Sequence, residues 1–378
     1  MPDRVLAAMA HPMPNIYAGE LVDVCDEVFA RLPAIAGTDG HALAAIGNGH
    51  SGWELAGSNT LSRGDKVLVL ETGRFPEVWA RFLAVSGIEV ESLPGPTRRA
   101  IDPAVVHDRL ASGPPDEFAA VAAAHVDTAI SVRNDIAALG DAIRSSGSSA
   151  LFMVDCIASL GCDEFHMDDW NVDITIAASQ KGLMTPPGLG LIWVNERAVE
   201  RGRGNDLRTG YFNWDPRLQP EAIYQRFSGT PPISHLYALR EALRMIDDEG
   251  GLDAVWARHA VLADAVRVAV DVWSAPGGLE LYIDEPADRA NCVTTVMTPD
   301  VDAREIARHC EEGAGLTIGL GVMDHARTFR IGHMGHLNPP SILGTLGTIE
   351  AALHRMGVPM GGSGVAAAAE VIGRALPE

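Results

Sequence analysis

The sequence predicts an α/β protein with a large, mostly parallel sheet domain and a smaller C-terminal α/β domain. Three observations lead to this fold class. The chain has 378 residues, enough for roughly two domains. Over its first two thirds, short apolar runs alternate with helical stretches, as in βαβ units around a parallel sheet. After about Pro231 the pattern changes to long helical stretches. We therefore expect a large domain at 1–248 and a small domain at 249–378.

In the large domain, strands are expected where apolar runs follow turn residues. The run at 66–70 (KVLVL) follows a turn at 62–65, and the helical stretch at 75–85 ends at Ser86 and Gly87. The strand at 172–178 is followed by a run at 189–194 that pairs naturally with it. The expected strands are 66–70, 89–93, 118–123, 150–154, 172–178 and 189–194, and the expected helices are 75–85 and 130–145.

In the small domain, two long helical stretches are joined by the turn Glu249-Gly250-Gly251. Shorter elements follow them. The expected helices are 233–248, 252–273, 303–310 and 341–356, and the expected strands are 279–283, 292–297 and 328–331. The tail from Gly361 onward is rich in Gly and Ala, which predicts a loose helix or a frayed end.

Charge and cysteine content exclude several classes of function. With 29 Lys+Arg and 50 Asp+Glu, the net charge is −21, which disfavours binding to nucleic acids and anionic membranes. The longest apolar runs, such as 118–124, are far too short to span a membrane. The five cysteines form no Cys-x-x-Cys pair, so we expect reduced thiols and not a disulfide framework or a zinc ribbon. Together these features predict a cytoplasmic protein.

The string Gly47-Asn48-Gly49-His50-Ser51-Gly52 fits the pattern G-x-G-x-x-G. It follows the apolar run 42–46, and Glu71 lies at the end of a strand about twenty residues later, where a dinucleotide fold has its ribose-binding acid. A glycine-rich turn before a helix also binds other phosphates through free backbone N–H groups. The string therefore predicts a phosphate site, a dinucleotide site of an NAD-dependent dehydrogenase, or only a tight turn.

A more specific signal comes from Asp155 and Lys181, which each follow an apolar strand. Ligands collect at the carboxyl ends of the strands in an open α/β sheet. The chain has only two lysines, Lys66 and Lys181, and the second stands before the rigid loop Pro186-Pro187-Gly188. A half-buried lysine amine can form a Schiff base with an aldehyde, and a carboxylate opposite it can keep a pyridine nitrogen protonated.

These residues resemble those of the class V aminotransferases of fold type I, which use pyridoxal 5′-phosphate (PLP). The similarity covers nearly the whole chain and is most specific at 154–190, and it is greatest to the alanine–glyoxylate and serine–glyoxylate (serine–pyruvate) aminotransferases. It implies a large sheet domain of the seven-stranded type. It also implies that Lys181 carries PLP as a Schiff base, that Asp155 pairs with the pyridine nitrogen, and that Gln180 binds the phosphate.

The resemblance extends to further site residues. In relatives, the positions of Asn48, Gly49 and His50 form a phosphate loop. The position of Phe75 carries an aromatic ring stacked on the pyridine, and that of Thr128 contacts the cofactor. Thr230 matches a residue that reaches the phosphate of the neighbouring subunit, which implies a homodimer with shared active sites. Arg330 matches the arginine that holds the substrate carboxylate.

The sequence departs from the family pattern at several positions. Asn48 replaces a Ser or Thr of the phosphate loop. Phe75 stands where relatives often have Trp, and Phe227 replaces a Tyr that reaches across the dimer. Relatives begin with a Gly-Pro-rich loop that lines the substrate pocket, and this sequence starts just after the place of that loop. Either the chain as given is truncated or its pocket is built differently.

The function that the resemblance implies is ping-pong transamination between a small L-amino acid, such as alanine or serine, and a 2-oxo acid such as glyoxylate or pyruvate. The alternatives are a lyase or cysteine desulfurase of the same fold, the dehydrogenase that would use Gly47, Gly49 and Gly52, and a non-catalytic small-molecule binding protein. A desulfurase needs a mobile catalytic cysteine, and no cysteine stands in a recognisable loop for that role.

No metal site is expected. His325, His333 and His336 lack a fourth ligand at convincing spacing. The acidic run of Asp163, Glu164, Asp168 and Asp169 could bind calcium, but we expect it to be a solvated connection.

Overall fold

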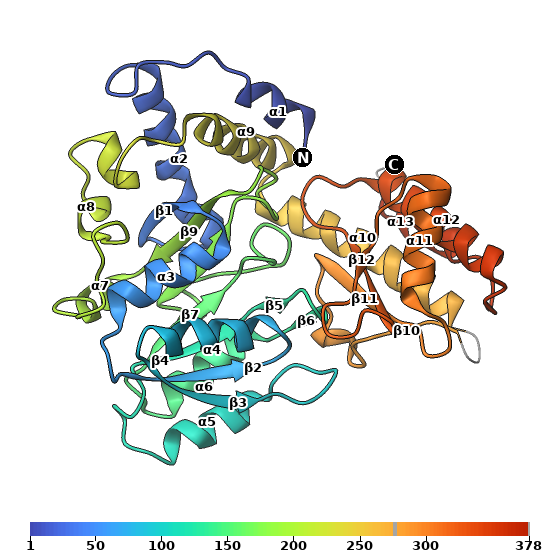
Figure 1. Ribbon diagram of the computed structural model, residues 1–378, viewed down its shortest axis with the longest axis horizontal. Coiled ribbons are helices and arrows are strands. Elements are labelled where there is room, and N and C mark those ends of the chain that lie inside the picture. Colours follow the sequence, from blue (N-terminus) through green and yellow to red (C-terminus); the bar gives the residue numbers. More distant parts are fainter. Residues whose placement is uncertain (275–277, 377–378) are drawn as a thin grey trace.

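The computed structural model describes residues 1–274 and 278–376, and its central element is a seven-stranded sheet (Figure 1). The strand order is β1-β9-β8-β7-β4-β2-β3. The strands are β1 (His41–Gly47), β2 (Lys66–Glu71), β3 (Glu89–Pro94), β4 (Ala120–Ala124), β7 (Leu151–Asp155), β8 (Ile174–Ala178) and β9 (Gly188–Val194). Five neighbouring strands from β3 to β8 are parallel, and β9 runs antiparallel to both β8 and β1. The expected mostly parallel sheet is confirmed.

Helices cover both faces of this sheet because its strands are apolar on both sides. In β7, Leu151 and Met153 join one core, while Phe152 and Val154 join the other, as the alternation of a strand requires. One face carries α3 (Gly49–Thr60), α4 (Phe75–Val85) and α7 (Glu196–Arg201). The other carries α2 (Glu20–Ala36), α5 (Pro103–Ala111), α6 (Ile136–Ser145) and α9 (Ile233–Glu249). Two short helices complete this part of the chain, α1 (Asp3–Met9) and α8 (Asp215–Leu218), together with the 3-10 turn η1 (Ile223–Phe227).

The helix expected at 130–145 begins only at Ile136, so its first turn and a half was wrongly predicted. Residues Val132–Arg133 (β6) pair with Val126–Asp127 (β5) in a small antiparallel ribbon. The helix starts where the Asp135 side chain accepts a hydrogen bond from the Ala138 N–H at 2.9 Å. In this segment the pairing of β6 with β5 therefore prevails over the helical spacing of the apolar residues.

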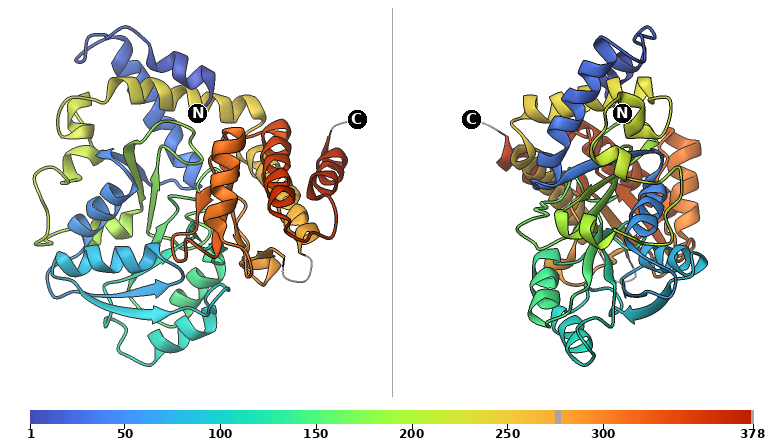
Figure 2. Two further views of the ribbon diagram at one scale, coloured as in Figure 1. Left: turned by 45° about the vertical axis from the view of Figure 1, so that its right-hand side comes forward. Right: turned by 90° about the vertical axis from the view of Figure 1, so that its left-hand side faces the viewer.

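A second, smaller unit follows α9 and gathers on one side of the large sheet, as Figure 1 and the left view of Figure 2 show. Its antiparallel sheet has the order β10-β11-β13-β12 and its own apolar core. The elements are α10 (Leu252–Trp273), β10 (Glu280–Leu281), the 3-10 turn η2 (Pro286–Asp288), β11 (Val293–Met297), α11 (Ala303–Ala314), β12 (Gly319–Leu320), β13 (Thr328–Gly332), α12 (Pro339–Met356) and α13 (Gly364–Ala375). The expected smaller α/β unit is confirmed, and the boundary at residue 248 stays a prediction.

Within its described residues, the C-terminal tail forms a packed helix, α13 (Gly364–Ala375), and not a loose one; residues 377 and 378 lie outside the described residues. Helix α13 contributes Ala368 and Ile372 to the core of the small unit. Its first residue, Gly364, lies so close to Trp273 that an added Cβ would meet the indole Nε1 at 2.5 Å. The Gly- and Ala-rich composition therefore serves close helix packing.

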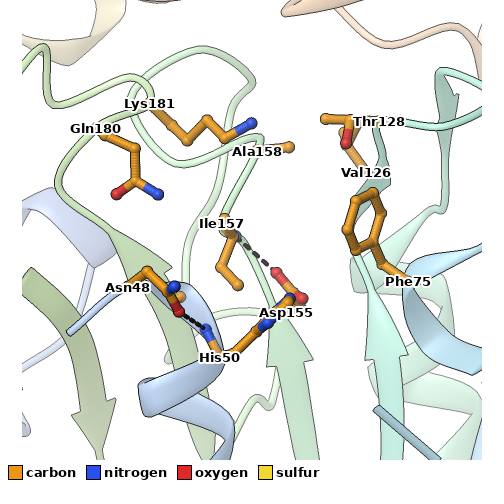
Figure 3. Close-up of a pocket in the computed structure, with 11 residues that line it drawn as sticks. Asn48, His50, Phe75, Val126, Thr128, Asp155, Ile157, Ala158, Gln180 and Lys181 are labelled. Atoms are coloured by element: carbon orange, nitrogen blue, oxygen red, sulfur yellow. Dashed lines mark hydrogen bonds between the residues drawn. The ribbon is translucent and has the colours of Figure 1, made fainter. Parts of the chain in front are cut away.

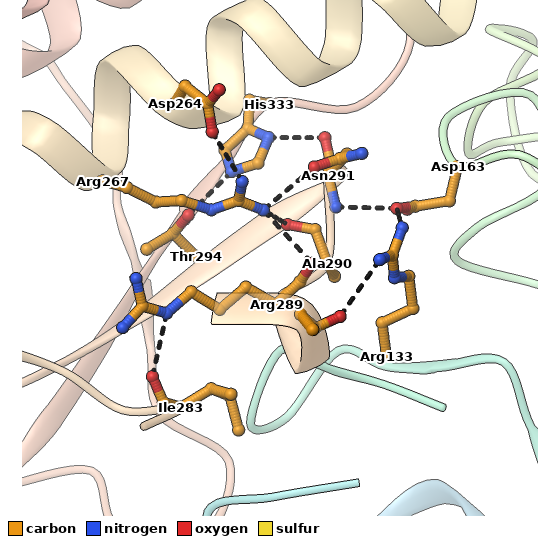
Figure 4. Close-up of polar contacts among 11 residues, drawn as sticks. Arg133, Asp163, Asp264, Arg267, Ile283, Arg289, Ala290, Asn291, Thr294 and His333 are labelled. Carbon is orange, nitrogen blue, oxygen red and sulfur yellow. Dashed lines mark hydrogen bonds and ion pairs between the residues drawn. The ribbon is translucent and has the colours of Figure 1, made fainter. Parts of the chain in front are cut away.

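Buried polar side chains join the two units (Figure 4). Asp163, which follows the β7 strand, accepts a hydrogen bond from the Asn291 N–H at 2.9 Å and lies 3.8 Å from the Arg133 guanidinium. Arg267 donates to Asn291 Oδ1 at 3.0 Å, and His333 is hydrogen-bonded to the Asn291 carbonyl at 2.8 Å. The expectation of a solvated acidic run is wrong for Asp163, which is fully buried because it ties the large unit to the small one.

Within the described residues, no helix is both long enough and apolar enough to cross a membrane.

Candidate active site

A cavity opens at the carboxyl ends of β7 and β8, where the sequence predicts a ligand site (Figure 3). It encloses about 200 Å³, whereas a single water needs roughly 10–15 Å³ by the same measure. The lining residues are Asn48, Gly49, His50, Phe75, Val126, Thr128, Asp155, Ile157, Ala158, Gln180 and Lys181. Eight predicted site residues thus meet in one cavity, although they come from five separate segments of the chain.

Asp155 is the last residue of β7, and its carboxylate is almost completely buried. Oδ1 accepts a hydrogen bond from the Ile157 N–H at 2.7 Å, and Oδ2 accepts one from the Trp53 indole Nε1 at 2.9 Å. Burial raises the pKa of Asp155 to about 7, against the effect of these two donors. A positive ligand group beside Asp155 would favour its ionised form.

Lys181 lies in the turn after β8, and its side chain points into the cavity (Figure 3). The turn is held by hydrogen bonds from the Met184 N–H to the Lys181 carbonyl and from the Thr185 N–H to the Ser179 carbonyl, both 3.0 Å. Within residues 1–274 and 278–376, the Lys181 amine has no ion-pair partner. Lys66, in contrast, binds Glu91 and Glu117 at 2.8 Å each. Lys181 is therefore the lysine available for chemistry in the cavity.

The N-terminus of α3 enters the cavity beside Lys181. Asn48 caps the helix, since its side-chain oxygen accepts a hydrogen bond from the His50 N–H at 3.0 Å. Gly49 packs closely on Ile157, since an added Cβ would lie 2.3 Å from the end of the Ile157 side chain and force it to move. Gln180 lies nearby, and its buried Oε1 has no hydrogen-bond partner within the described chain. A helix N-terminus next to a side-chain amide can bind an anion such as a phosphate, because the backbone N–H groups and the amide NH2 group can all donate hydrogen bonds to it.

The aromatic wall of the cavity is held by Asp127, a residue that the sequence analysis did not single out. Its carboxylate accepts hydrogen bonds from the N–H groups of Phe75 at 2.7 Å and Ala129 at 2.8 Å. Gly73 leaves room for it, since a Cβ there would lie 2.4 Å from the Asp127 carboxyl carbon. Asp127 thus ties the loop of Phe75 to the turn of Thr128. The only signal in the sequence is an aspartate two residues before Ala129, as in many Asx turns.

Arg330, on β13 of the small unit, reaches the edge of the cavity without lining it. Its Nη1 donates to the Thr128 carbonyl at 3.0 Å and its Nε donates to the Leu320 carbonyl at 3.1 Å. Burial lowers the pKa of Arg330, and Asp127 acts in the opposite direction. A half-buried guanidinium at this edge can bind a carboxylate.

Thr230 does not lie in this cavity. It is exposed in the loop after η1, next to Gly229. Its expected contact with a neighbouring subunit stays a prediction.

The geometry argues against two of the alternative functions, the NAD-dependent dehydrogenase and the cysteine desulfurase. In a dinucleotide fold the glycine-rich turn belongs to a parallel βαβ unit, but β1 is an edge strand, antiparallel to β9 and far from β2 in the sheet. All five cysteines are buried, and burial raises the pKa of the Cys25 and Cys162 thiols to about 12, so neither suits the role of a mobile nucleophile. Among the described residues, no group of three His, Cys, Asp or Glu side chains is arranged to hold a metal ion.

Comparisons with known proteins agree with this geometry. Residues 44–327 match the family described as Aminotransferase class-V. The chain is 37% identical to a serine–glyoxylate aminotransferase of Methylorubrum extorquens, over 98% of this chain and 93% of that protein. It is 34% identical to an L-aspartate–glyoxylate aminotransferase of Paracoccus denitrificans, over 92% and 90%. Among solved structures, a pyridoxamine–pyruvate aminotransferase of Mesorhizobium loti superposes with a TM-score of 0.89 at 26% identity, over 99% and 95% of the two chains.

Proposed function

Because this chain belongs to the class V aminotransferase family, we propose that it transfers the amino group of a small L-amino acid to a 2-oxo acid such as glyoxylate or pyruvate, using PLP. One observation carries the proposal: the Lys181 amine and the Asp155 carboxylate share one cavity with the N-terminus of α3. Glyoxylate is favoured as an acceptor because the relatives in Methylorubrum and Paracoccus are both glyoxylate aminotransferases.

The residues of the cavity fit PLP in their chemistry. Asp155 would hold the protonated ring nitrogen, since a buried carboxylate with a raised pKa is stabilised by a cation. The N-terminus of α3 and the side-chain NH2 group of Gln180, both at the cavity, would donate hydrogen bonds to the phosphate group. Phe75 would stack on the ring. When bound, PLP supplies an aldehyde for the amino group and a ring that accepts electrons from the substrate α-carbon.

The protein side chains provide proton transfer and orientation. The Lys181 Nζ would move a proton from the substrate α-carbon to the C4′ carbon of PLP when the amino acid reacts, and in the opposite direction when the 2-oxo acid reacts. Arg330 would hold the α-carboxylate at the edge of the cavity, where its guanidinium already bonds the Thr128 carbonyl. The amino group would stay with the enzyme after the first product leaves, so donor and acceptor would use the same carboxylate site in turn, with ping-pong kinetics.

We propose further that the protein acts in the cytoplasm as a homodimer with shared active sites. Five free cysteines favour a reducing compartment. Thr230, exposed in the loop after η1, is free to reach a second subunit.

The proposal is tested by adding PLP to the purified protein and following its absorption against a panel of amino acids, with and without glyoxylate. We expect a covalent adduct on Lys181 after borohydride reduction and loss of the original absorption band with small L-amino acids. The Lys66→Ala variant is the control, because Lys66 lies in a surface ion pair. An adduct on Lys66, or no turnover by any amino acid, would contradict the proposal.

A further inference from the structure

Trp53, on α3, is buried directly behind the cavity and does not line it. Its indole Nε1 donates a hydrogen bond to Asp155 Oδ2 at 2.9 Å. The other carboxylate oxygen accepts from the Ile157 N–H at 2.7 Å, as the dashed line in Figure 3 marks. Each oxygen of Asp155 therefore has one donor, and the two donors come from different segments of the chain. Together they fix the rotation of the carboxylate.

The indole itself is held in place by aromatic neighbours. Its ring stacks on His50 with the centroids 4.2 Å apart, and on Trp79 with the centroids 5.7 Å apart and an angle of 11° between the planes. Phe82 packs edge-on at 5.5 Å. Trp53 is therefore a rigid donor, which cannot turn its N–H away from Asp155 without disrupting this stack.

We propose that Trp53 is a positioning residue of the aminotransferase reaction, which fixes the orientation of Asp155 and stabilises its ionised form for the ring nitrogen of the cofactor. This inference rests on the function proposed above. Trp53 does not line the cavity, and the single N–H of its side chain donates to Asp155, so we expect it to act on the ring nitrogen through Asp155.

The electrostatic environment of Asp155 explains why such a donor matters. Burial raises the pKa of this carboxyl to about 7, and the nearby Asp127 raises it further. The hydrogen bonds from Ile157 and Trp53 and the charge of Lys181 act in the opposite direction. His50, the titratable group stacked on Trp53, has a pKa lowered by burial and so favours its neutral form. Without Trp53 the pKa of Asp155 would rise, and a protonated carboxyl does not attract a cationic ring nitrogen.

The chain offers a matched pair of variants, Trp53→Phe and Trp79→Phe. Both tryptophans are buried and belong to the same stack. The Nε1 of Trp79, however, has no hydrogen-bond partner in the described part of the chain. The two substitutions therefore remove the same atoms from neighbouring sites, but only the first removes a donor to Asp155.

The first measurement is the titration of Asp155 in cofactor-free protein, followed by NMR of carboxyl-labelled aspartate and assigned with Asp155→Asn. We expect Trp53→Phe to move the midpoint upward by about one pH unit, roughly a tenfold change in proton affinity. Trp79→Phe should leave it unchanged. Equal midpoints in the two variants would overturn the proposal.

The second measurement is the PLP dissociation constant as a function of pH. Near neutral pH, we expect Trp53→Phe to bind PLP about three- to tenfold more weakly than Trp79→Phe. This ratio should fall as the pH rises past the new midpoint, because Asp155 is then ionised in both variants and only the effect of its orientation remains. A packing defect alone would give a ratio that does not change with pH, and that result would refute the positioning role.

If Trp53→Phe does not fold, the wild-type protein still tests the contact. In ¹⁵N-tryptophan-labelled, cofactor-free protein, the indole resonance most perturbed by Asp155→Asn should titrate with the Asp155 midpoint. The absence of any such resonance would overturn the inference. Failure of the wild type to bind PLP would instead refute the proposed function, while the NMR titrations would still decide the Trp53 contact.

Discussion

Replacing Arg330 with lysine separates substrate binding from cofactor binding. In the structure the guanidinium uses Nε and one N–H of Nη1 for the Leu320 and Thr128 carbonyls. Of its five N–H groups, the second on Nη1 and both on Nη2 stay available, which is the planar arrangement that binds a carboxylate through two parallel bonds. A lysine that kept both carbonyl contacts would have one N–H left. The variant therefore loses at least one charge-assisted bond to the substrate.

The loss is expected to be about 2–4 kcal/mol of transition-state stabilisation, roughly 30- to 1,000-fold in kcat/KM. The assay is rapid-mixing absorption of the PLP-loaded enzyme in each half-reaction separately, first with an amino acid and then with a 2-oxo acid. Both half-reactions should fall by the same factor, because donor and acceptor share the carboxylate site, and PLP should stay bound.

The control is Arg289→Lys. Arg289 also bonds a backbone carbonyl of the small unit, that of Ile283 at 3.0 Å, without lining the cavity. Near wild-type kcat/KM in Arg330→Lys, or damage confined to one half-reaction, would refute the reasoning and assign the carboxylate to another group.

Two further predictions follow from the site. In cofactor-free protein the pKa of Asp155 is raised to about 7, so the folded state holds a proton that the unfolded chain releases above about pH 4. The contribution of Asp155 to stability is therefore lost as the pH rises from about 4 to 7. Urea unfolding at several pH values should show that Asp155→Asn is more stable than wild type above pH 7 and lacks this pH dependence. The same change of unfolding free energy with pH in both proteins would contradict the prediction. For Thr230, mixed dimers of Thr230→Ala and Lys181→Ala chains should be more active per intact Lys181 than the Thr230→Ala homodimer, because the partner supplies the threonine. Equal activities would remove the shared-site role.

Much of the site could be predicted because strand periodicity and strand ends are local properties of the sequence. Asp155 and Lys181 each follow a run that is buried on both sides, and the parallel sheet brings such ends to one edge. Helix α10 has the expected bounds, since Gly251 and Ser274 flank an uninterrupted helical pattern.

The rest depends on contacts between distant segments. Whether Asp163 is solvated is decided by Asn291, which is 128 positions away in the chain. The pairing of β5 with β6, which replaces the start of a helix, is likewise invisible to helical spacing. Trp53 has the pattern of any core residue on α3, and its role depends on which atom its N–H meets.

The buried carboxylates of Asp127 and Asp155 show why position in the sequence does not determine which one serves a ligand. Asp127 accepts hydrogen bonds from three backbone N–H groups, those of Phe75, Ala129 and Ile130. Asp155 accepts one backbone N–H and one indole N–H. A carboxylate has about four acceptor sites, so three of those of Asp127 are taken by backbone N–H groups of its own turn and of Phe75, whereas Asp155 can still accept a proton-bearing nitrogen. Both side chains are buried, so exposure does not distinguish them. The number of hydrogen-bond donors that the fold supplies does: Asp127 is used to hold the aromatic wall of the cavity, and Asp155 is left to bind a ligand.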